Sequence, residues 1–478
     1  MTKITKSILK FILPLASLGL FLAASIVVLI ISQGQKLEES GQFIQTGIIR
    51  ITSIPADNIK AYINDEEVQL SDFRITGINP GVVNLRLSKE GYSPWEKQIK
   101  VESGIVKDVF AQLYPNTVPF SKIAEQNISK SFYSADGQYI YYTVLNKSAL
   151  DGIWRIKLSR NLLDFSNTLQ RSQIVRFTAL ETEELLNNSY NLLISSNNNK
   201  LILQAGSNNY LYNLSDTTKR TNLNQQLNIN TTQELSWFKE DQSIIFKYDN
   251  YYFEYDLVSQ QISVVNLTES DSTISVTTNT IYFIRNNKLY YYTNKAIAEY
   301  KFTSKLVPFI PNQLDNVYTV AENPNILVLS TNNTLYYVDL QKEFVDVIDT
   351  TANFYKGLSN GRLILYTKNN SLHSYYTEDN FNANTLDTFN YSLNISLEDF
   401  DNLEFASTGK NIVFFKDNKA TIMDYDGLNA HTLLEDFKFV DNKLLFANNN
   451  TEIYALIQEK DTTGLEVNNI YKFELKLK

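Results

Sequence analysis

Apolar residues run without a charge from residue 11 to residue 31, in the segment FILPLASLGLFLAASIVVLII. A helix rises 1.5 Å per residue, so this run spans roughly 30 Å, the thickness of a bilayer's hydrocarbon core. Lysines precede it at positions 3, 6 and 10, and cytoplasmic flanks of membrane helices are rich in Lys and Arg. The pattern predicts a cytoplasmic tail over 1–10, a transmembrane signal anchor over 11–33 and an extracytoplasmic remainder.

A cleaved signal peptide is the competing interpretation of this run, because Leu22-Ala23-Ala24-Ser25 offers small residues. The apolar part of such a peptide usually spans about 7–15 residues, and here it continues to Ile31. We therefore favour an uncleaved anchor, followed by a polar spacer over 34–46.

Apolar and polar positions alternate with a period of two over residues 47–114, which predicts strands with one buried face. Turn-forming pairs such as Asn64-Asp65 and Pro80-Gly81 separate the alternating segments. We expect a compact antiparallel sheet or sandwich. The positions predicted to share its core are Ile49, Ile51, Ile59, Ala61, Ile63, Val83, Leu85, Leu87, Ile99, Val101, Val109, Ala111 and Leu113.

Two stretches of this segment, IRITSIPADNIKAYIND and NPGVVNLRLSKEGYSPW, resemble the PEGA domain. The usual P-x-G-A turn is Pro55-Ala56-Asp57-Asn58 here, and VQLSDFRIT replaces the usual Gly-Thr-Pro segment. The resemblance implies a surface interaction module and not a catalyst. Gly81, Gly91, Tyr92 and Trp95 are then residues of turns and core.

From about residue 117 to the C-terminus one unit recurs, made of apolar strands separated by polar turns. Its second strand is the most apolar, and successive second strands begin 37 to 62 residues apart. Several strands per unit of about forty residues predict a β-propeller over 117–478, with eight blades, or seven if one unit is incomplete. The second strands are predicted at Tyr139–Tyr142, Leu201–Leu203, Ile244–Phe246, Ile281–Phe283, Ile326–Val328, Leu363–Leu365, Ile412–Phe414 and Ile453–Ala455.

The last unit ends in NIYKFELKLK, with no room for a fourth strand. We expect a strand within 117–125 to complete that blade, which would hide two exposed strand edges. The segments FYSADGQYIYY and IMDYDGLNAHTL resemble TolB-type propellers, a resemblance that marks architecture more than activity.

The amino-acid composition limits the classes of binding partner and the kinds of chemical site that we expect. The net charge of −9, with no basic stripe beyond the N-terminus, argues against nucleic acid. The absence of Cys excludes disulfides, thiolate metal sites and Cys nucleophiles. Abundant Tyr and Phe, 30 and 27 residues, favour strands over helices.

The stretch IMDYDGLNAHTL offers a candidate metal site, because Asp424, Asp426 and His431 lie close together in sequence. Aligning the repeats places Asp426 with Asp256 and Asp339, each just before a turn, whereas the other two positions do not recur as ligands. A calcium loop would also need further oxygen ligands and a terminal Glu. We therefore interpret Asp426 as a turn residue and predict no metal.

Other candidate sites have simpler interpretations. His373 is expected on a strand, facing solvent or a neighbouring blade. The stretch STGKN at 407–411 lacks the upstream Gly of a phosphate loop, so we predict a turn there. The acidic runs ETEE at 181–184 and LEDFDN at 397–402 could suggest a glycosidase pair, but we expect solvated loops. No G-x-S-x-G motif is present.

The sequence thus predicts an all-β protein behind one membrane helix. With no catalytic, cofactor-binding or metal-binding residue indicated, we interpret it as a non-enzymatic binding or scaffold protein of a bacterial cell envelope. The expected partners are the membrane, through one helix, and an envelope protein or cell-wall glycan. The alternatives are a glycan or peptide hydrolase that uses carboxylates at the propeller mouth, or a propeller docked on a membrane complex.

Overall fold

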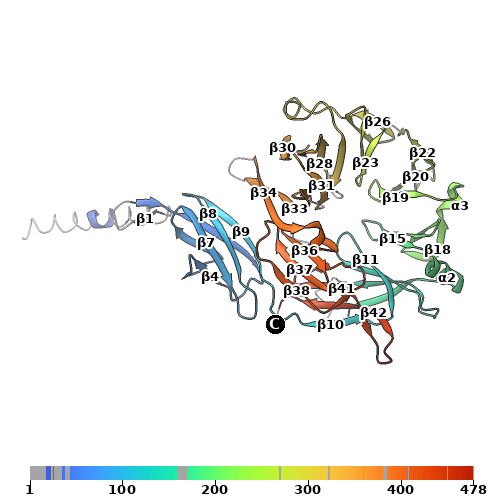
Figure 1. Ribbon diagram of the computed structural model, residues 1–478, viewed down its shortest axis with the longest axis horizontal. Coiled ribbons are helices and arrows are strands. Elements are labelled where there is room, and N and C mark those ends of the chain that lie inside the picture. The colour runs from blue at the N-terminus through green and yellow to red at the C-terminus, as the bar shows by residue number, and fades with distance from the viewer. Residues whose placement is uncertain are drawn as a thin grey trace, which may run out of the picture. The chain divides into compact units, whose positions relative to one another are not determined.

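The computed structural model divides the chain into two compact units, Met1–Thr117 with Lys476–Lys478, and Val118–Leu475 (Figure 1). It describes residues 18–22, 25, 35–37 and 43–476, apart from 159–168, 268–270, 321–322, 359, 381–384, 407–408 and 449. Most of the anchor predicted over 11–33 lies outside these residues. A membrane-crossing helix, long and apolar enough for a bilayer, is not found among them.

The first unit contains two facing sheets and a short additional strand pair. The sheet orders are β6-β3-β9 and β5-β4-β7-β8, and β1 pairs with β2. The strands are β1 (Gln35–Leu37), β2 (Phe43–Gln45), β3 (Gly47–Ile54), β4 (Lys60–Ile63), β5 (Glu66–Val68), β6 (Arg74–Ile78), β7 (Gly81–Ser88), β8 (Trp95–Val101) and β9 (Val106–Gln112).

One core joins the two sheets, and it uses the alternating positions of the sequence. Ile49 and Ile51 of β3 pack in the same buried cluster as Leu85, Leu87 and Trp95 of the other sheet. The predicted antiparallel arrangement is wrong for one pair, because β3 and β9 run parallel. Parallel neighbours need a crossover connection, and here the chain passes through the opposite sheet between them.

The described residues of the second unit form eight sheets of four or five strands. The first four sheets comprise β11 (Ile128–Tyr133), β12 (Tyr139–Val144), β13 (Gly152–Lys157) and β14 (Gln170–Arg176); β15 (Tyr190–Ile194), β16 (Lys200–Ala205), β17 (Asn208–Asn213) and β18 (Asp216–Asn222); β19 (Gln233–Phe238), β20 (Ser243–Tyr248), β21 (Tyr251–Asp256) and β22 (Ile262–Val265); and β23 (Ser272–Val276), β24 (Ile281–Arg285), β25 (Lys288–Thr293) and β26 (Ala296–Glu299).

In the next three sheets the strands again follow one another in chain order, whereas the last sheet also includes a strand from the start of the unit. They comprise β27 (Asn316–Val320), β28 (Asn323–Thr331), β29 (Thr334–Asp339) and β30 (Phe344–Asp349); β31 (Asn353–Gly357), β32 (Leu363–Lys368), β33 (Ser371–Asn380) and β34 (Thr385–Ser396); β35 (Asn402–Phe405), β36 (Asn411–Lys416), β37 (Lys419–Asp424) and β38 (His431–Leu434); and β39 (Lys438–Phe439), β40 (Leu445–Ala447), β41 (Glu452–Lys460), β42 (Glu466–Glu474) and β10 (Phe120–Ala124).

Each sheet packs against the next, and the eighth packs against the first. Seven buried apolar clusters each span two neighbouring sheets. At the junction of the seventh and eighth sheets Phe415 meets Phe439 edge to face, with ring centroids 5.4 Å apart. The sheets therefore form a closed ring around one axis (Figure 1), an eight-bladed β-propeller whose blades we number 1 to 8 in chain order.

The ring closes as the sequence predicts. Strand β10, from the start of the unit, pairs antiparallel with β42 as the outermost strand of blade 8, with Phe120 opposite Phe473. Ala124 of β10 is fully buried in the cluster shared with blade 1. All eight predicted second strands are also confirmed, and they form β12, β16, β20, β24, β28, β32, β36 and β41.

Short helices, α2 (Ala179–Asn187) and α3 (Leu223–Leu227), connect three of the blades. The loop expected for ETEE at 181–184 is wrong, because these residues lie in α2. Thr178 accepts a hydrogen bond from the Glu181 amide and the Glu181 carboxylate accepts one from the Thr178 amide, a capping box that starts the helix. The stretch LEDFDN contains a short 3-10 helix, η1 (Leu397–Asp399), which also begins with a capping box.

Candidate ligand-binding site

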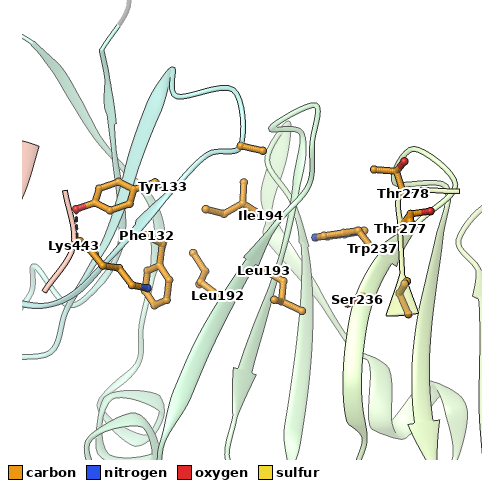
Figure 2. A pocket seen from close by; sticks show the side chains of 13 residues that line it. Phe132, Tyr133, Leu192, Leu193, Ile194, Ser236, Trp237, Thr277, Thr278 and Lys443 are labelled. Carbon is orange, nitrogen blue, oxygen red and sulfur yellow. Dashed lines mark hydrogen bonds between the residues drawn. The ribbon is translucent and has the colours of Figure 1, made fainter. Parts of the chain in front are cut away.

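A cavity of about 490 Å³ lies where the innermost strands of blades 1 to 4 end. It is bounded on one side by the segment between β39 and β40 of blade 8. Figure 2 shows side chains from successive blades facing this space. Its lining comprises Ser131, Phe132, Tyr133, Ala135, Leu192, Leu193, Ile194, Ser236, Trp237, Val276, Thr277, Thr278 and Lys443.

The lining is apolar at its centre and polar at its margins. Strand β15 contributes the aliphatic run Leu192–Ile194, flanked by Phe132 on one side and Trp237 on the other. Hydroxyl groups come from Ser, Thr and Tyr residues of three blades, and Lys443 supplies the charged group of the lining. Such a wall, apolar with a few placed polar groups, is typical of sites that bind a ligand by shape and a few hydrogen bonds.

Trp237 carries a buried donor that has no partner in the part of the chain that the structure describes. Its indole nitrogen is shielded from solvent and makes no hydrogen bond. Figure 2 shows the nitrogen-bearing edge of the ring turned toward Leu193 and Ile194, which offer no side-chain acceptor. By contrast, the Trp154 indole donates to the Leu150 carbonyl at 2.9 Å. The Trp237 N–H is therefore enclosed between the blades and does not open into the cavity, and leaving it unsatisfied costs free energy.

Carboxylates lie behind one wall of the cavity. Ser131 donates to the Asp441 carboxylate at 3.0 Å, and burial raises the pKa of Asp441 above its ordinary value. Burial, together with the charges of Asp441 and Glu404, also raises the pKa of the Tyr133 hydroxyl. Glu404 accepts a hydrogen bond from Lys356 at 3.0 Å. Hydrogen bonds of Ser131 thus link Tyr133 of blade 1 with Asp441 of blade 8, while Lys356 and Glu404 form a separate pair between blades 6 and 7.

Hydrogen bonds between blades hold the turns around the cavity. The Asn198 amide of blade 2 donates to Asp136 of blade 1 at 2.8 Å. Ser196 donates to Asp241 of blade 3 at 2.6 Å. Asp241 is buried and has a positive φ of 67°. Hydrogen bonds between these turns therefore link blades 1 to 3 next to the cavity.

The stretch IMDYDGLNAHTL forms the end of β37, a turn and the start of β38. The predicted alignment of Asp426 with Asp256 and Asp339 is wrong by two residues. Asp424 is their counterpart, because each of the three is the last residue of a third strand, and they pair with Ser243, Ile326 and Asn411 of the second strands. The turn here is longer, which displaced the alignment.

Hydrogen bonds assign both aspartates of this stretch to the turn. The buried Asp424 carboxylate accepts from the side-chain amides of Asn411 at 2.8 Å and Asn429 at 2.9 Å. Asp426 accepts from the Leu428 amide at 3.3 Å, as expected of a turn residue. His431 starts β38 opposite Ile422. No group of three His, Asp or Glu able to hold a metal occurs within the described ranges.

The remaining candidates also have structural roles. His373 lies on β33 and stacks on Tyr366 of the same blade, with ring centroids 5.2 Å apart; burial lowers its pKa. In STGKN, Gly409 has a φ of 68° and donates to the Ala406 carbonyl at 2.9 Å, which confirms a turn. No residue of the cavity lining was predicted as a binding site, because the lining comes from separate repeats that lie together only in the ring.

Comparison with known families and structures identifies one part of the chain. Residues 46–116 match the PEGA domain, so the resemblance noted for the first unit is confirmed. No curated protein matches the sequence.

Solved structures similar to this chain include β-propellers. The WD40 domain of SCAP from fission yeast is 9% identical with a TM-score of 0.42, over 75% of this chain and 98% of that chain. Porphyromonas gingivalis dipeptidyl peptidase 4 is 12% identical with a TM-score of 0.45, over 72% and 60%. PorZ, a surface component of the type-IX secretion system of the same species, is 10% identical with a TM-score of 0.36, over 72% and 43%. The propeller assignment itself rests on the sheet order and the closed ring.

Proposed function

We propose that this protein is an extracytoplasmic binding or scaffold protein of a bacterial cell envelope. In this proposal, residues 11–33 anchor it in the membrane, the PEGA domain acts as a spacer or wall-binding module, and the propeller, of the TolB type, binds a ligand in its axial cavity. The observation that carries the binding role is that cavity, which residues from five blades line and in which Lys443 is the charged residue.

The anchor is supported by the uncharged run from residue 11 to residue 31 and the lysines before it. The surface role is supported by the PEGA match over 46–116. Affinity capture from envelope extract, with the full chain as bait, tests the binding role. We expect retention of a protein or glycan by the wild type and weaker retention by Ala135→Asp, which puts a charge on an exposed position of the cavity lining. Equal retention by both baits would contradict a role for the cavity.

Hydrolysis is the second candidate, and one observation favours it. Asp441 and Glu404 lie on the innermost segments of adjacent blades, and both act on the pKa of Tyr133. However, neither carboxylate is part of the cavity lining, where Lys443 is the charged residue. Incubation with cell-wall fragments and peptides tests this role. Turnover by the wild type that is lost in both Asp441→Asn and Glu404→Gln would support an enzyme, whereas intact substrates would count against one.

A further inference from the structure

We propose that the outer edge of blade 3 is a second binding site, where strand β22 adds an extended segment of a partner polypeptide to its sheet. β22 is the last strand in the order β19-β20-β21-β22, so one of its edges has no neighbouring strand in the part of the chain that the structure describes. It shares no residue with the cavity lining. This inference therefore goes beyond the proposed function.

The hydrogen-bond register turns the backbone groups of two residues toward the open edge. The Asp256 amide donates to the Gln261 carbonyl at 3.0 Å, and bonded and non-bonded pairs alternate along an antiparallel ladder. Ile262 and Val264 are therefore the non-bonded positions of β22, and their N–H and C=O groups face away from β21. Within the described ranges these groups make no hydrogen bond to another element. The edge thus presents two donors and two acceptors at the spacing of a strand.

The same two residues expose aliphatic side chains. Ile262 is 47% exposed and Val264 is 52% exposed, whereas Val265 is fully buried. Residues two apart on a strand lie on one face, and this face continues the apolar surface of Tyr255 and Phe253, which lie directly opposite on β21. Aliphatic side chains of an added strand would pack beside Ile262 and Val264 as cross-strand pairs.

β22 lacks the charged side chains that usually protect the edge of a sheet. No Lys, Arg, Asp or Glu occurs between Asp256 and Glu269. The outermost strands of the other blades contain such residues, apart from β38, whose Leu433 and Leu434 are buried. Among the outermost strands that the structure describes, β22 therefore combines an uncharged edge with exposed aliphatic side chains, and it fits a segment that has no charge.

The size of the edge favours a short segment over a second copy of this chain. The four residues of β22, at about 3.3 Å each, make a strand of about 13 Å, whereas a stable interface buries about 800 Å² on each partner. Two copies would also bring together two chains of net charge −9. The occupant that matches β22 is an extended, uncharged segment with an aliphatic residue at every second position, as in β-strand addition.

Fluorescence anisotropy with a labelled peptide tests this inference on the purified full chain in mild detergent. The probe is SVTVTIS with blocked ends, which has an aliphatic residue at every second position. A second probe carries methyl groups on its Val and Ile backbone nitrogens, so it keeps the side chains but cannot pair those residues with β22. The protein variants are Val264→Pro, which removes an N–H that faces the open edge, and Val264→Lys, which adds a charge to that edge.

We expect the wild type to bind the unmodified probe and not the methylated one. Val264→Pro should weaken binding about three- to tenfold through one lost hydrogen bond, and Val264→Lys should weaken it because a charge would lie against aliphatic groups. Val347→Lys is the matched control, because Val347 is 44% exposed on β30, an edge that already contains Asp346 and Asp349. It should leave affinity within about twofold of wild type.

Equal binding of the two probes by the wild type would overturn the inference without reliance on any variant. Failure of the wild type to bind the unmodified probe would do the same, as would equal affinities of wild type and Val264→Pro. In sedimentation velocity, a dimer that Val264→Lys dissociates would also overturn it, because a second copy would then occupy the edge. These outcomes leave the cavity untouched, and Ala135→Asp tests the cavity separately.

Discussion

At the scale of single residues, two polar side chains differ in whether their polar atoms are paired within the protein. Trp237 and Asp424 are both partly or fully buried polar residues, but only Asp424 has its polar atoms matched by neighbours. Matched buried groups stabilise a fold, while an unmatched one is kept at a cost. This difference makes stability measurements informative about which buried polar groups are paired within the protein.

Replacing the two indoles should have unequal effects on the free energy of unfolding. Both Trp→Phe changes lose ring area, but Trp154→Phe also loses its hydrogen bond to the Leu150 carbonyl. We expect Trp154→Phe to be more destabilising than Trp237→Phe by about 1 kcal/mol in urea unfolding. A larger loss for Trp237→Phe would mean that its N–H is satisfied within the protein.

The two aspartates of the β37–β38 turn should also differ. Asp424→Ala leaves the amides of Asn411 and Asn429 without their acceptor in a buried site, so we expect a loss of about 1–3 kcal/mol. Asp426→Ala removes one long hydrogen bond to the Leu428 amide, and should cost about 0.5 kcal/mol. Thermal unfolding of both variants measures this order. A calcium- or zinc-dependent rise in melting temperature that Asp426→Ala abolishes would instead indicate a metal site.

Glu452 should make blade 8 sensitive to acid. Burial alone would raise its pKa, but hydrogen bonds from Lys472 and Tyr454 outweigh burial and hold the pKa below its ordinary value of 4.5. A depressed folded-state pKa contributes stability above about pH 4.5 that is lost as the pH falls. The stability difference between wild type and Glu452→Gln should therefore shrink from pH 7 to pH 4 in urea unfolding. An equal difference at both pH values would refute this role.

At the scale of elements, the second strands are predictable because their continuous apolar runs require burial on both faces. The strand that closes the ring is predictable because the last unit is one strand short. The parallel pairing of β3 with β9 and the register at Asp424 were missed, because both depend on which strands become neighbours and on turn length. The cavity was missed for the same reason, since its walls come from separate blades.

Closure by β10 should be essential to the stability of the propeller. Ala124 is fully buried between blades 8 and 1, whereas Ser121 of the same strand is exposed. Ala124→Asp places an unpaired charge in that core, and we expect the melting temperature to fall by several degrees or more. Ser121→Asp is the matched control and should change little. A melting temperature of Ala124→Asp equal to that of wild type would show that β10 is dispensable.

At the scale of the whole molecule, the proposal combines three parts with separate roles. The apolar run over 11–33 would hold the chain at the membrane, the segment that matches the PEGA domain over 46–116 would act outside it, and the propeller would present its axial cavity to a partner. The anchor and the location are inferred from the sequence, and the cavity comes from the ring of blades. Binding at that cavity is the central claim.

Site-specific photo-crosslinking in intact native cells tests this claim most directly. A photoreactive phenylalanine analogue is placed at Thr278, on the cavity lining, or at Ser121, which is exposed on β10 away from that lining. We expect a discrete protein adduct from position 278 that is reduced in the Ala135→Asp background, and none from position 121. Adducts of equal yield at both positions, or none at position 278, would contradict binding at the axial cavity.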